Sequence, residues 1–338
     1  MKKSLVALAV MGAMSGAAFA QSNVQVYGIV DAGIERTSSG GVDKTTVGSG
    51  LQSGSRIGFK GTEDLGNGLS AQFVLEQGIK VDDGSVADAT SNAFGRQAWV
   101  GVGSKDFGGL RLGRQNTPIR GVVEAIDPFA IGLAGNAIKV LGNGQIAERT
   151  SNAVTYVSPN FKGFQAQVQY GMGETAQSST TNGYTGLSAT YANGPVMAAF
   201  AYAEQKTDLA PSDKKASNWI LGGTYDLTVA KLHAAYSEGK NDDAVAGTSL
   251  KGSNYLVGVS APFGAHTVMA SYIQNKNKDV ASADSDVYAL GYTYSLSKRT
   301  NVYASYSHTS NDANVKLNGA TANGDSADKY NFGIRHQF

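Results

Sequence analysis

Apolar and polar side chains alternate along most of the chain. The pattern is clearest where Phe164, Ala166, Val168, Tyr170 and Met172 alternate with three glutamines and a glycine. Successive side chains of a β-strand point to opposite faces of a sheet, so this segment is expected to be a strand with one apolar and one polar face.

The same alternation recurs in sixteen segments. They cover residues 23–36, 51–62, 68–79, 94–104, 109–116, 150–159, 163–173, 183–193, 196–206, 216–227, 229–240, 252–262, 266–277, 285–297, 300–311 and 327–338. The ends of such segments are placed only to within about 2–4 residues by pattern alone. The pattern therefore predicts an all-β fold of sixteen strands. If the strands are antiparallel, an even number brings both ends of the chain to the same end of the sheet.

The connections between these segments form two alternating sets. One set is short, as at Asn193-Gly194-Pro195. The other set is longer and rich in Asn, Asp, Ser and Thr, at residues 37–50, 80–93, 207–215, 241–251 and 312–326. A soluble sandwich gives no reason for all long loops to lie at one end, whereas an outer-membrane barrel has tight periplasmic turns and long external loops. The barrel must also close, because hydrocarbon cannot satisfy an open sheet edge.

One connection is far longer and less polar than the others. It runs from about Thr117 to Glu148 and carries apolar residues such as Phe129 and Ile131. A long loop with apolar residues is not expected to remain in solvent. We interpret it as a loop that folds into the barrel, since about sixteen strands would otherwise enclose a wide aqueous channel. An external lid and a contact with a neighbouring subunit are the alternatives.

The start of the chain has the features of a secretory signal. Lys2 and Lys3 form a positive region before an apolar stretch, and Ala18-Phe19-Ala20 supplies the small residues that a signal peptidase reads. The apolar stretch is shorter than the ~20 residues of a membrane-spanning helix. We therefore expect a cleaved signal peptide over residues 1–20 and an outer-membrane β-barrel over residues 21–338.

Composition agrees with a barrel. Loss of the signal removes two lysines from 28 basic and 27 acidic side chains, which leaves a charge of −1 and no reason to expect nucleic acid as a partner. The chain has no cysteine, so its stability does not depend on disulfides. It is rich in Gly and Tyr, which suits a barrel in which only every second residue need be apolar. Tyrosines and phenylalanines near many strand ends would form the interfacial girdles of such a barrel.

Several motifs resemble the Gram-negative general porin family. They are Val26–Gly33, Ser53–Gly66, Phe94–Ala98, Leu112–Gln115, Tyr156–Phe161 and the terminal Gly333–Phe338. Each motif alone is weak, but together they extend over essentially the whole mature chain. The resemblance implies a 16-stranded antiparallel transmembrane β-barrel, usually a homotrimer, with the third external loop folded into the lumen. It implies passive diffusion of ions and small hydrophilic solutes, in contact with the lipid bilayer and lipopolysaccharide of the outer membrane.

The resemblance also implies a set of charges at the narrowest part of the channel. In similar anion-preferring porins, arginines that match Arg56, Arg96 and Arg149 line one wall of the constriction. Arg56 and Lys60 are independently expected on the lumen face, because Phe59 occupies the apolar parity of the same segment.

Arg96 is harder to place. Strict alternation groups it with Ala98 and Val100 on the lipid face. A bulge, or a strand that begins only at Gln97, would turn its side chain inward.

Two carboxylates of the long loop complete the expected constriction. Glu124 and Asp127 could face the arginines and create a transverse field across a narrow aqueous gap. Ordinary solvated charges at strand ends are the alternative. The loop also departs from the acidic pattern of cation-selective relatives, so the ion preference stays open here, with anions favoured by the arginines.

The last residue, Phe338, lies on the lipid-facing parity of its segment. In similar porins the terminal aromatic residue is implied to be the signal that the barrel-assembly machinery reads. A further girdle aromatic is the alternative.

Sites for catalysis or cofactors are not expected. The four histidines are scattered without metal-ligand spacing, and no complete nucleophile elbow, phosphate loop or His-Glu-x-x-His motif is found. An outer-membrane enzyme would need a Ser/His/Asp or paired-acid cluster near one rim, and a structural barrel would not need an inserted loop. A sugar-specific porin would carry an aromatic row along the lumen, where Trp99 is the main aromatic residue expected.

Overall fold

A computed structural model describes residues 23–87, 92–141, 147–173, 183–209, 212–242 and 250–338. The expected signal peptide at residues 1–20 lies outside this part of the chain. The strands are β1 (Asn23–Ser39), β2 (Val42–Ser49), β3 (Arg56–Gly66), β4 (Leu69–Gly78), β5 (Gln97–Ser104), β6 (Gly108–Asn116), β7 (Arg149–Val157), β8 (Phe164–Gly171), β9 (Tyr184–Asn193), β10 (Val196–Leu209), β11 (Ser212–Asp226), β12 (Lys231–Asn241), β13 (Leu250–Phe263), β14 (His266–Asn277), β15 (Ser285–Ser295), β16 (Thr300–Asn311) and β17 (Ala327–Gln337). Two helices, α2 (Pro118–Ile126) and η2 (Ala137–Lys139), lie between β6 and β7.

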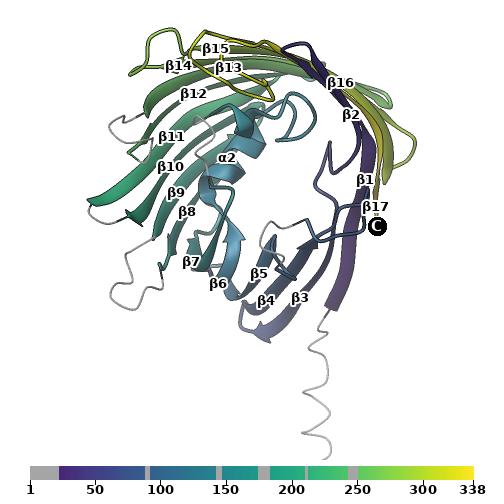
Figure 1. Cartoon of the computed structure of the whole chain (residues 1–338). Helices are drawn as coiled ribbons and strands as arrows, with labels where there is room; N and C mark the ends of the chain where they lie inside the picture. The colour runs from purple at the N-terminus through teal and green to yellow at the C-terminus, as the bar shows by residue number, and fades with distance from the viewer. Residues whose placement is uncertain (1–22, 88–91, 142–146, 174–182, 210–211, 243–249) are drawn as a thin grey trace, which may run out of the picture.

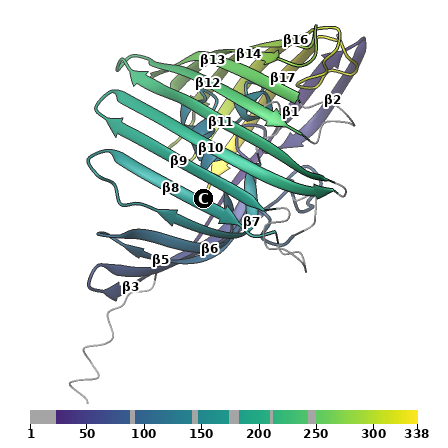
Figure 2. The same cartoon turned by 90° about the vertical axis from the view of Figure 1, so that its left-hand side faces the viewer.

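The strands form one closed antiparallel barrel. β1 pairs with β17 from Ile29↔Gln337 to Ser39↔Ala327, which joins the first strand to the last and leaves no open edge there. β3 pairs with the first half of β1 and β2 with the second half, so these two strands share one position. The seventeen strands of the sheet therefore occupy sixteen positions, as the sequence predicts. Figure 1 shows the ring of strands, and Figure 2 shows neighbouring strands running side by side at a common tilt.

Two of the expected long loops are corrected by the structure. Residues 37–50 contain strand β2, which turns back from β1 through Gly40 and Gly41. Both glycines have positive φ angles, 57° and 78°, as a two-residue hairpin turn requires. Residues 207–215 belong to a second hairpin, because β10 and β11 stay paired as far as Leu209↔Ser212. In β2 even Val42 and Val47 are more than half exposed, so no buried face marks that strand in the sequence.

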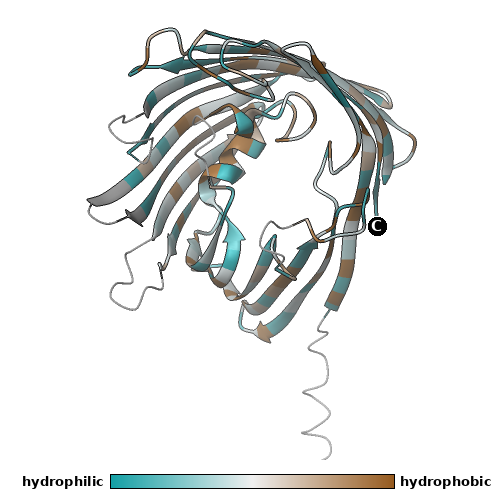
Figure 3. Ribbon diagram, in the orientation of Figure 1, coloured by the Kyte–Doolittle hydropathy of each residue, from teal (hydrophilic) through white to brown (hydrophobic). Residues whose placement is uncertain are grey.

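The outer face of the barrel is apolar. Exposed side chains such as Val24, Val100, Val257 and Leu290 lie on the parity that the sequence assigns to lipid, each at least half exposed. Figure 3 shows apolar and polar residues alternating along the strands. In the described residues, no helix combines the length and hydropathy that a membrane-spanning helix needs.

The described part of the long connection between β6 and β7, residues 117–141 and 147–148, lies inside the barrel, as expected. Figure 1 shows α2 within the ring of strands. The helix begins with Pro118 after the N-cap Thr117, whose hydroxyl accepts a hydrogen bond from the backbone N–H of Arg120. Its apolar stripe packs against inward-facing residues of the wall, including Ile220.

Four fully buried side chains form that stripe: Ile119, Val122, Val123 and Ile126. Burial of each stabilises the docked loop by about 1.5–3 kcal/mol. At the end of α2, His233 of β12 hydrogen-bonds the carbonyl oxygen of Ile126 through Nδ1 at 3.0 Å and Ser260 through Nε2 at 3.0 Å. Asn275 holds the end of η2 by donating to the Val140 carbonyl oxygen at 3.2 Å. The alternatives of an external lid and a subunit contact are thus excluded for this part of the loop.

Candidate functional site

A buried carboxylate joins two arginines on one wall of the lumen. Glu76 of β4 is 3% exposed. Its Oε1 lies 2.6 Å from Nε of Arg96, and its Oε2 lies 3.9 Å from Nη1 of Arg56. The hydroxyl of Tyr27 donates to the same Oε2 at 3.0 Å. A buried charge is stable only when it is paired and hydrogen-bonded, and this arrangement holds both guanidinium groups in place.

The structure resolves how Arg96 reaches this cluster. Strand β5 begins at Gln97, so Arg96 precedes the strand and is not bound by its alternation. Its backbone N–H donates to the Glu76 carbonyl oxygen at 3.2 Å, and its side chain turns inward to the Glu76 carboxylate.

Arg149 and Arg120 extend the positive charge along the same region. Arg149 begins β7, within electrostatic range of Arg96 and Arg120. Among the described residues its buried Nε atom has no hydrogen-bond partner. Arg120 projects from α2, is 7% exposed, and pairs with Glu124 at 2.7 Å and Glu148 at 3.7 Å.

The carboxylates of the loop occupy two different environments. Glu124 is half exposed, pairs with Arg120 along α2, and lies within electrostatic range of Arg56. Burial alone would disfavour the charge of Glu148, but Lys139, Arg149 and Arg120 outweigh burial and hold the pKa of that carboxyl below its usual value.

Asp127 does not face the arginines, and that expectation is wrong. It is 3% exposed, and its carboxylate accepts backbone N–H groups of Phe129 at 3.0 Å, Ile131 at 2.9 Å and Ala137 at 3.0 Å. Burial raises the pKa of Asp127 to about 6, against the effect of these three hydrogen bonds. Asp127 therefore shapes the turn after α2 and contributes no charge to the open channel.

Lys60 lies further along the same wall. It is four residues from Arg56 on β3, or about 13 Å along an extended strand. Its exposed ammonium group lies 5.1 Å from the ring centroid of Tyr27. Among the described residues Lys60 forms no ion pair with Glu76, and it contacts the cluster through the ring of Tyr27.

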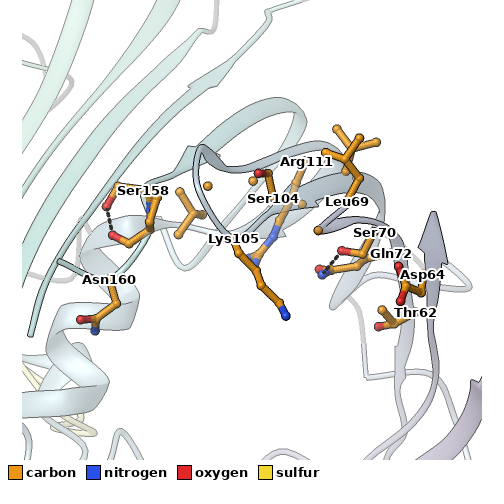
Figure 4. A pocket seen from close by; sticks show the side chains of 18 of the residues that line it. Thr62, Asp64, Leu69, Ser70, Gln72, Ser104, Lys105, Arg111, Ser158 and Asn160 are labelled. Atoms are coloured by element: carbon orange, nitrogen blue, oxygen red, sulfur yellow. Dashed lines mark hydrogen bonds between the residues drawn. The ribbon is translucent and has the colours of Figure 1, made fainter. Parts of the chain in front are cut away.

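A hollow of about 680 Å³ continues the lumen wall towards the short turns. Figure 4 shows Lys105 extending into it between Ser158 and Asn160 on one side and Gln72 and Asp64 on the other.

Arg111 also lines this hollow, and its guanidinium group lies 4.7 Å from the ring centroid of Trp99. Trp99 therefore faces inward, as its parity predicts. The lining residues are mostly polar and carry a positive charge into the channel mouth.

Sequence reasoning missed Glu76, Arg120 and Glu148. The spacing of Arg120 and Glu124, four residues apart behind Pro118, is a helix signal that could have indicated their ion pair. The role of Glu76 depends on the pairing of β3, β4 and β5, which a single chain pattern does not give. In the described residues, no group of three or more His, Asp or Glu side chains could hold a metal ion.

Comparisons with known proteins agree on one family. The family model described as Gram-negative porin matches residues 7–314. The chain is 35% identical over 357 residues to outer membrane porin protein 32 of Delftia acidovorans, with 100% of both chains covered. It is 32% identical over 396 residues to an outer membrane porin protein of Bordetella pertussis, again with 100% of both chains covered. The solved structure of an anion-selective porin from Comamonas acidovorans has a TM-score of 0.83 and 31% identity, and it covers 94% of this chain and 100% of its own.

Proposed function

Because the chain belongs to the Gram-negative porin family, we propose that it forms a passive outer-membrane channel that prefers small anions. The main support for the anion preference is the balance of charge where α2 narrows the lumen. Four guanidinium groups, those of Arg56, Arg96, Arg120 and Arg149, meet three carboxylates, those of Glu76, Glu124 and Glu148. A narrow, partly desolvated passage with net positive charge attracts anions and repels cations.

The arrangement within this passage supports the same preference. Glu76 is covered by its partners, so its charge is largely satisfied before an ion arrives. Arg149, in contrast, forms no ion pair among the described residues, so its positive charge is not cancelled by a carboxylate in direct contact. Inorganic anions and small organic carboxylates fit this chemistry. We propose a channel role alone and no enzymatic activity.

Conductance in a planar bilayer tests the channel itself. Purified mature protein should give stepwise, long-lived currents in potassium chloride, because the barrel is closed and its lumen is polar. The steps should come in groups of three if the assembly is a trimer. A folded, inserted barrel that leaves the bilayer insulating would refute the proposal.

Reversal potential in a potassium chloride gradient tests the selectivity. Arg56→Ser removes one positive charge from the wall and should shift the preference towards cations, and the Arg56/Arg149 double replacement should shift it further. Arg36→Ser is the control, because Arg36 is exposed and pairs with Asp43 at 2.7 Å near the end of β1. A shift with Arg36→Ser but none with Arg56→Ser would place the constriction elsewhere.

The distribution of aromatic residues supports a homotrimer. Tyr27 and Trp99 are the only Tyr and Trp residues before Tyr156, and both lie on the inward parity. The outer face of β1 to β6 therefore carries Val, Leu, Ile and Phe side chains without the Tyr and Trp residues that favour a lipid–water interface. From β7 to β17, by contrast, outward tyrosines are frequent. We propose that the outer face of β1 to β6 packs against neighbouring copies.

Quenching by brominated lipids tests this interface. In a Trp219→Phe background, a tryptophan placed at Val100 of β5 should be shielded from the lipid, whereas one placed at Val257 of β13 should be quenched. Both valines are exposed in the single chain, at 58% and 54%, so equal quenching would contradict the trimer interface.

A further inference from the structure

A short segment leaves the barrel wall between β2 and β3. The pairing of β2 with β1 ends at Ala32↔Ser49, and the pairing of β3 with β1 begins at Ile29↔Arg56. Only two residues of β1 lie between these pairs, whereas residues 50–55 must cover the same distance on the other side. They cannot stay extended along β1, although the alternation in the sequence predicts a strand from residue 51. These residues form the β2–β3 connection, and none of them is exposed.

The β2–β3 connection is attached to Asp31 of β1 along its whole length. Asp31 is 0% exposed, and its Oδ2 accepts the backbone N–H groups of Gln52 at 2.8 Å and Ser53 at 2.6 Å. The Asp31 carbonyl oxygen accepts the N–H of Gly50 at 2.8 Å, and the Asp31 N–H donates to Oγ of Ser55 at 3.0 Å. The start, the middle and the end of the connection are therefore all held by one residue.

Strand β16 supports the same carboxylate. The hydroxyl of Tyr303 donates to Oδ1 of Asp31 at 2.6 Å, so three donors converge on one buried acceptor. Hydrogen bonds to a carboxylate are among the strong ones in proteins. Asn301 of β16 also donates to the side-chain oxygen of Gln52 at 2.8 Å. The connection is thus fixed to two strands of the wall.

One side of the connection contacts the tip of the inserted loop. The N–H of Leu133 donates to the Leu51 carbonyl oxygen at 2.6 Å, and the Leu51 side chain packs against the cluster that contains Phe129 and Leu133. At Gly132 the two backbones come very close, because a Cβ atom there would lie 2.0 Å from the Gln52 carbonyl oxygen. Glycine alone has no Cβ and allows this approach.

The end of the connection contacts the two arginines that Glu76 holds. Nε of Arg56 donates to the Gly54 carbonyl oxygen at 2.8 Å. A Cβ atom on Gly54 would lie 2.8 Å from Nη1 of Arg96, so that guanidinium group packs against the Gly54 backbone. The connection therefore extends from the tip of the inserted loop to the arginines of the lumen wall.

We propose that the β2–β3 connection holds the loop tip at a fixed distance from Arg56 and Arg96, and that Asp31 is its positioning residue. The packing of α2 against β8 to β12 fixes the other part of the loop. The tip is also held to β16, where the N–H of Ala134 donates to Oγ of Ser305 at 3.2 Å. The proposal deepens the proposed function and rests on it, because it says what sets the width of the anion passage.

The replacement Gly132→Ala tests the contact without changing a charge. The added methyl group cannot fit against the Gln52 carbonyl oxygen and should move the loop tip away from the connection. If ions then pass roughly 12 Å instead of roughly 8 Å from the net positive charge, the chloride-to-potassium permeability ratio should fall about 1.5-fold. The conductance should rise, because the passage is wider.

Gly121→Ala is the matched control within the same loop. A Cβ atom at Gly121 of α2 meets nothing within 4 Å among the described residues, so the permeability ratio should stay at the wild-type value. Thermal melts establish that each variant is folded. An unchanged ratio in Gly132→Ala, or an equal fall in both variants, would overturn the proposal.

Replacements of Asp31 test its positioning role. Asp31→Ala removes the acceptor of Gln52 and Ser53. Loss of a negative charge alone would raise the chloride preference, whereas release of the connection should lower it. Asp31→Asn loses the same charge but keeps an acceptor oxygen and the shape of the side chain, so its ratio should not fall. A ratio that rises or stays unchanged in Asp31→Ala, or falls equally in Asp31→Asn, contradicts the positioning role.

Amide hydrogen exchange in detergent separates the connection from the channel. The amides of Gln52, Ser53 and Leu133 should exchange slowly in wild-type protein and fast in Asp31→Ala. Glu35→Ala is the control on the same face of β1 and should behave like wild type. An insulating wild-type barrel with this exchange pattern would refute the channel and support the attachment of the connection. Equal exchange in wild type and Asp31→Ala would refute the attachment, even in a barrel that conducts and prefers anions.

Discussion

Glu76 lies between two arginines of the lumen wall, so its replacement by glutamine tests how that wall sets ion preference. Glutamine keeps the length of the side chain and can still accept a hydrogen bond from Arg96 or Tyr27. The change therefore removes the negative charge that lies 2.6 Å from Arg96 and 3.9 Å from Arg56, with little change in shape. The freed guanidinium charges should make the passage more attractive to anions.

The expected size follows from Coulomb's law. An ion that passes roughly 8 Å from the lost charge interacts with it by about 0.5 kcal/mol in water. Screening at ~0.1 M salt, with a Debye length of about 10 Å, lowers this value to about 0.2 kcal/mol. The chloride and potassium energies shift in opposite directions, so the chloride-to-potassium permeability ratio should rise about twofold to fivefold.

The assay is the reversal potential of Glu76→Gln in a potassium chloride gradient. Glu35→Gln is the matched control, because Glu35 also faces inward and accepts from Asn331 at 2.9 Å. It is eight residues from Tyr27 on β1, about 26 Å along the strand and more than two Debye lengths away. An unchanged ratio, a shift towards cations in Glu76→Gln, or an equal shift in Glu35→Gln would refute the reasoning, provided that thermal melts show folded protein.

Three further predictions concern the loop and the chain end. Burial raises the pKa of Asp127 to about 6, above its value of about 4 in an unfolded chain, so the stability that its protonated form contributes is full below pH ~4 and is lost as pH rises through 6. On acidification from pH 7 to 4, wild type should therefore gain melting temperature relative to Asp127→Asn, and a relative loss or no change would contradict the burial effect. His233→Ala leaves the Ile126 carbonyl oxygen unpaired at a cost of about 1–3 kcal/mol and should increase open-channel noise, which would stay unchanged if the loop needs no such anchor. Deletion of Phe338, whose backbone pairs with Gly28, should lower outer-membrane yield in cells far more than refolding into detergent, whereas equal losses would indicate only a girdle role.

The strands were predictable because each one faces lipid on its outer side and water on its inner side, and its sequence alternates accordingly. β8, with Phe164 and Val168 outside and glutamines inside, shows the alternation that lipid and water impose on a barrel wall. β2 was missed because neither of its faces is buried, so no hydrophobic period marks it. The one available signal was the Gly40-Gly41 pair between two extended segments, which is typical of a tight hairpin.

The site was less predictable because its contacts join residues that only the register brings together. The inward position of Arg56 follows from its own strand, but its partner Glu76 comes from the next strand and depends on the pairing Arg56↔Gly78. The burial of Asp127 depends on the turn that the loop makes against the wall, which no local period records. The face on which a charge lies is thus readable from sequence inside a regular strand, whereas a pairing between charges on different strands is not.

The apolar stripe of α2 has a counterpart on the wall, and this limits how the pore can be engineered. Ala201, Ile220, Leu256 and Ile273 point inward and are covered by the inserted segment. Removing that segment to obtain a larger pore would leave an apolar surface exposed to water along one side of the lumen. Detergent tails or hydrophobic analytes would adsorb on this surface and block the ion current. A usable wide-bore version would have to convert these wall positions to serine, threonine or asparagine in the same step.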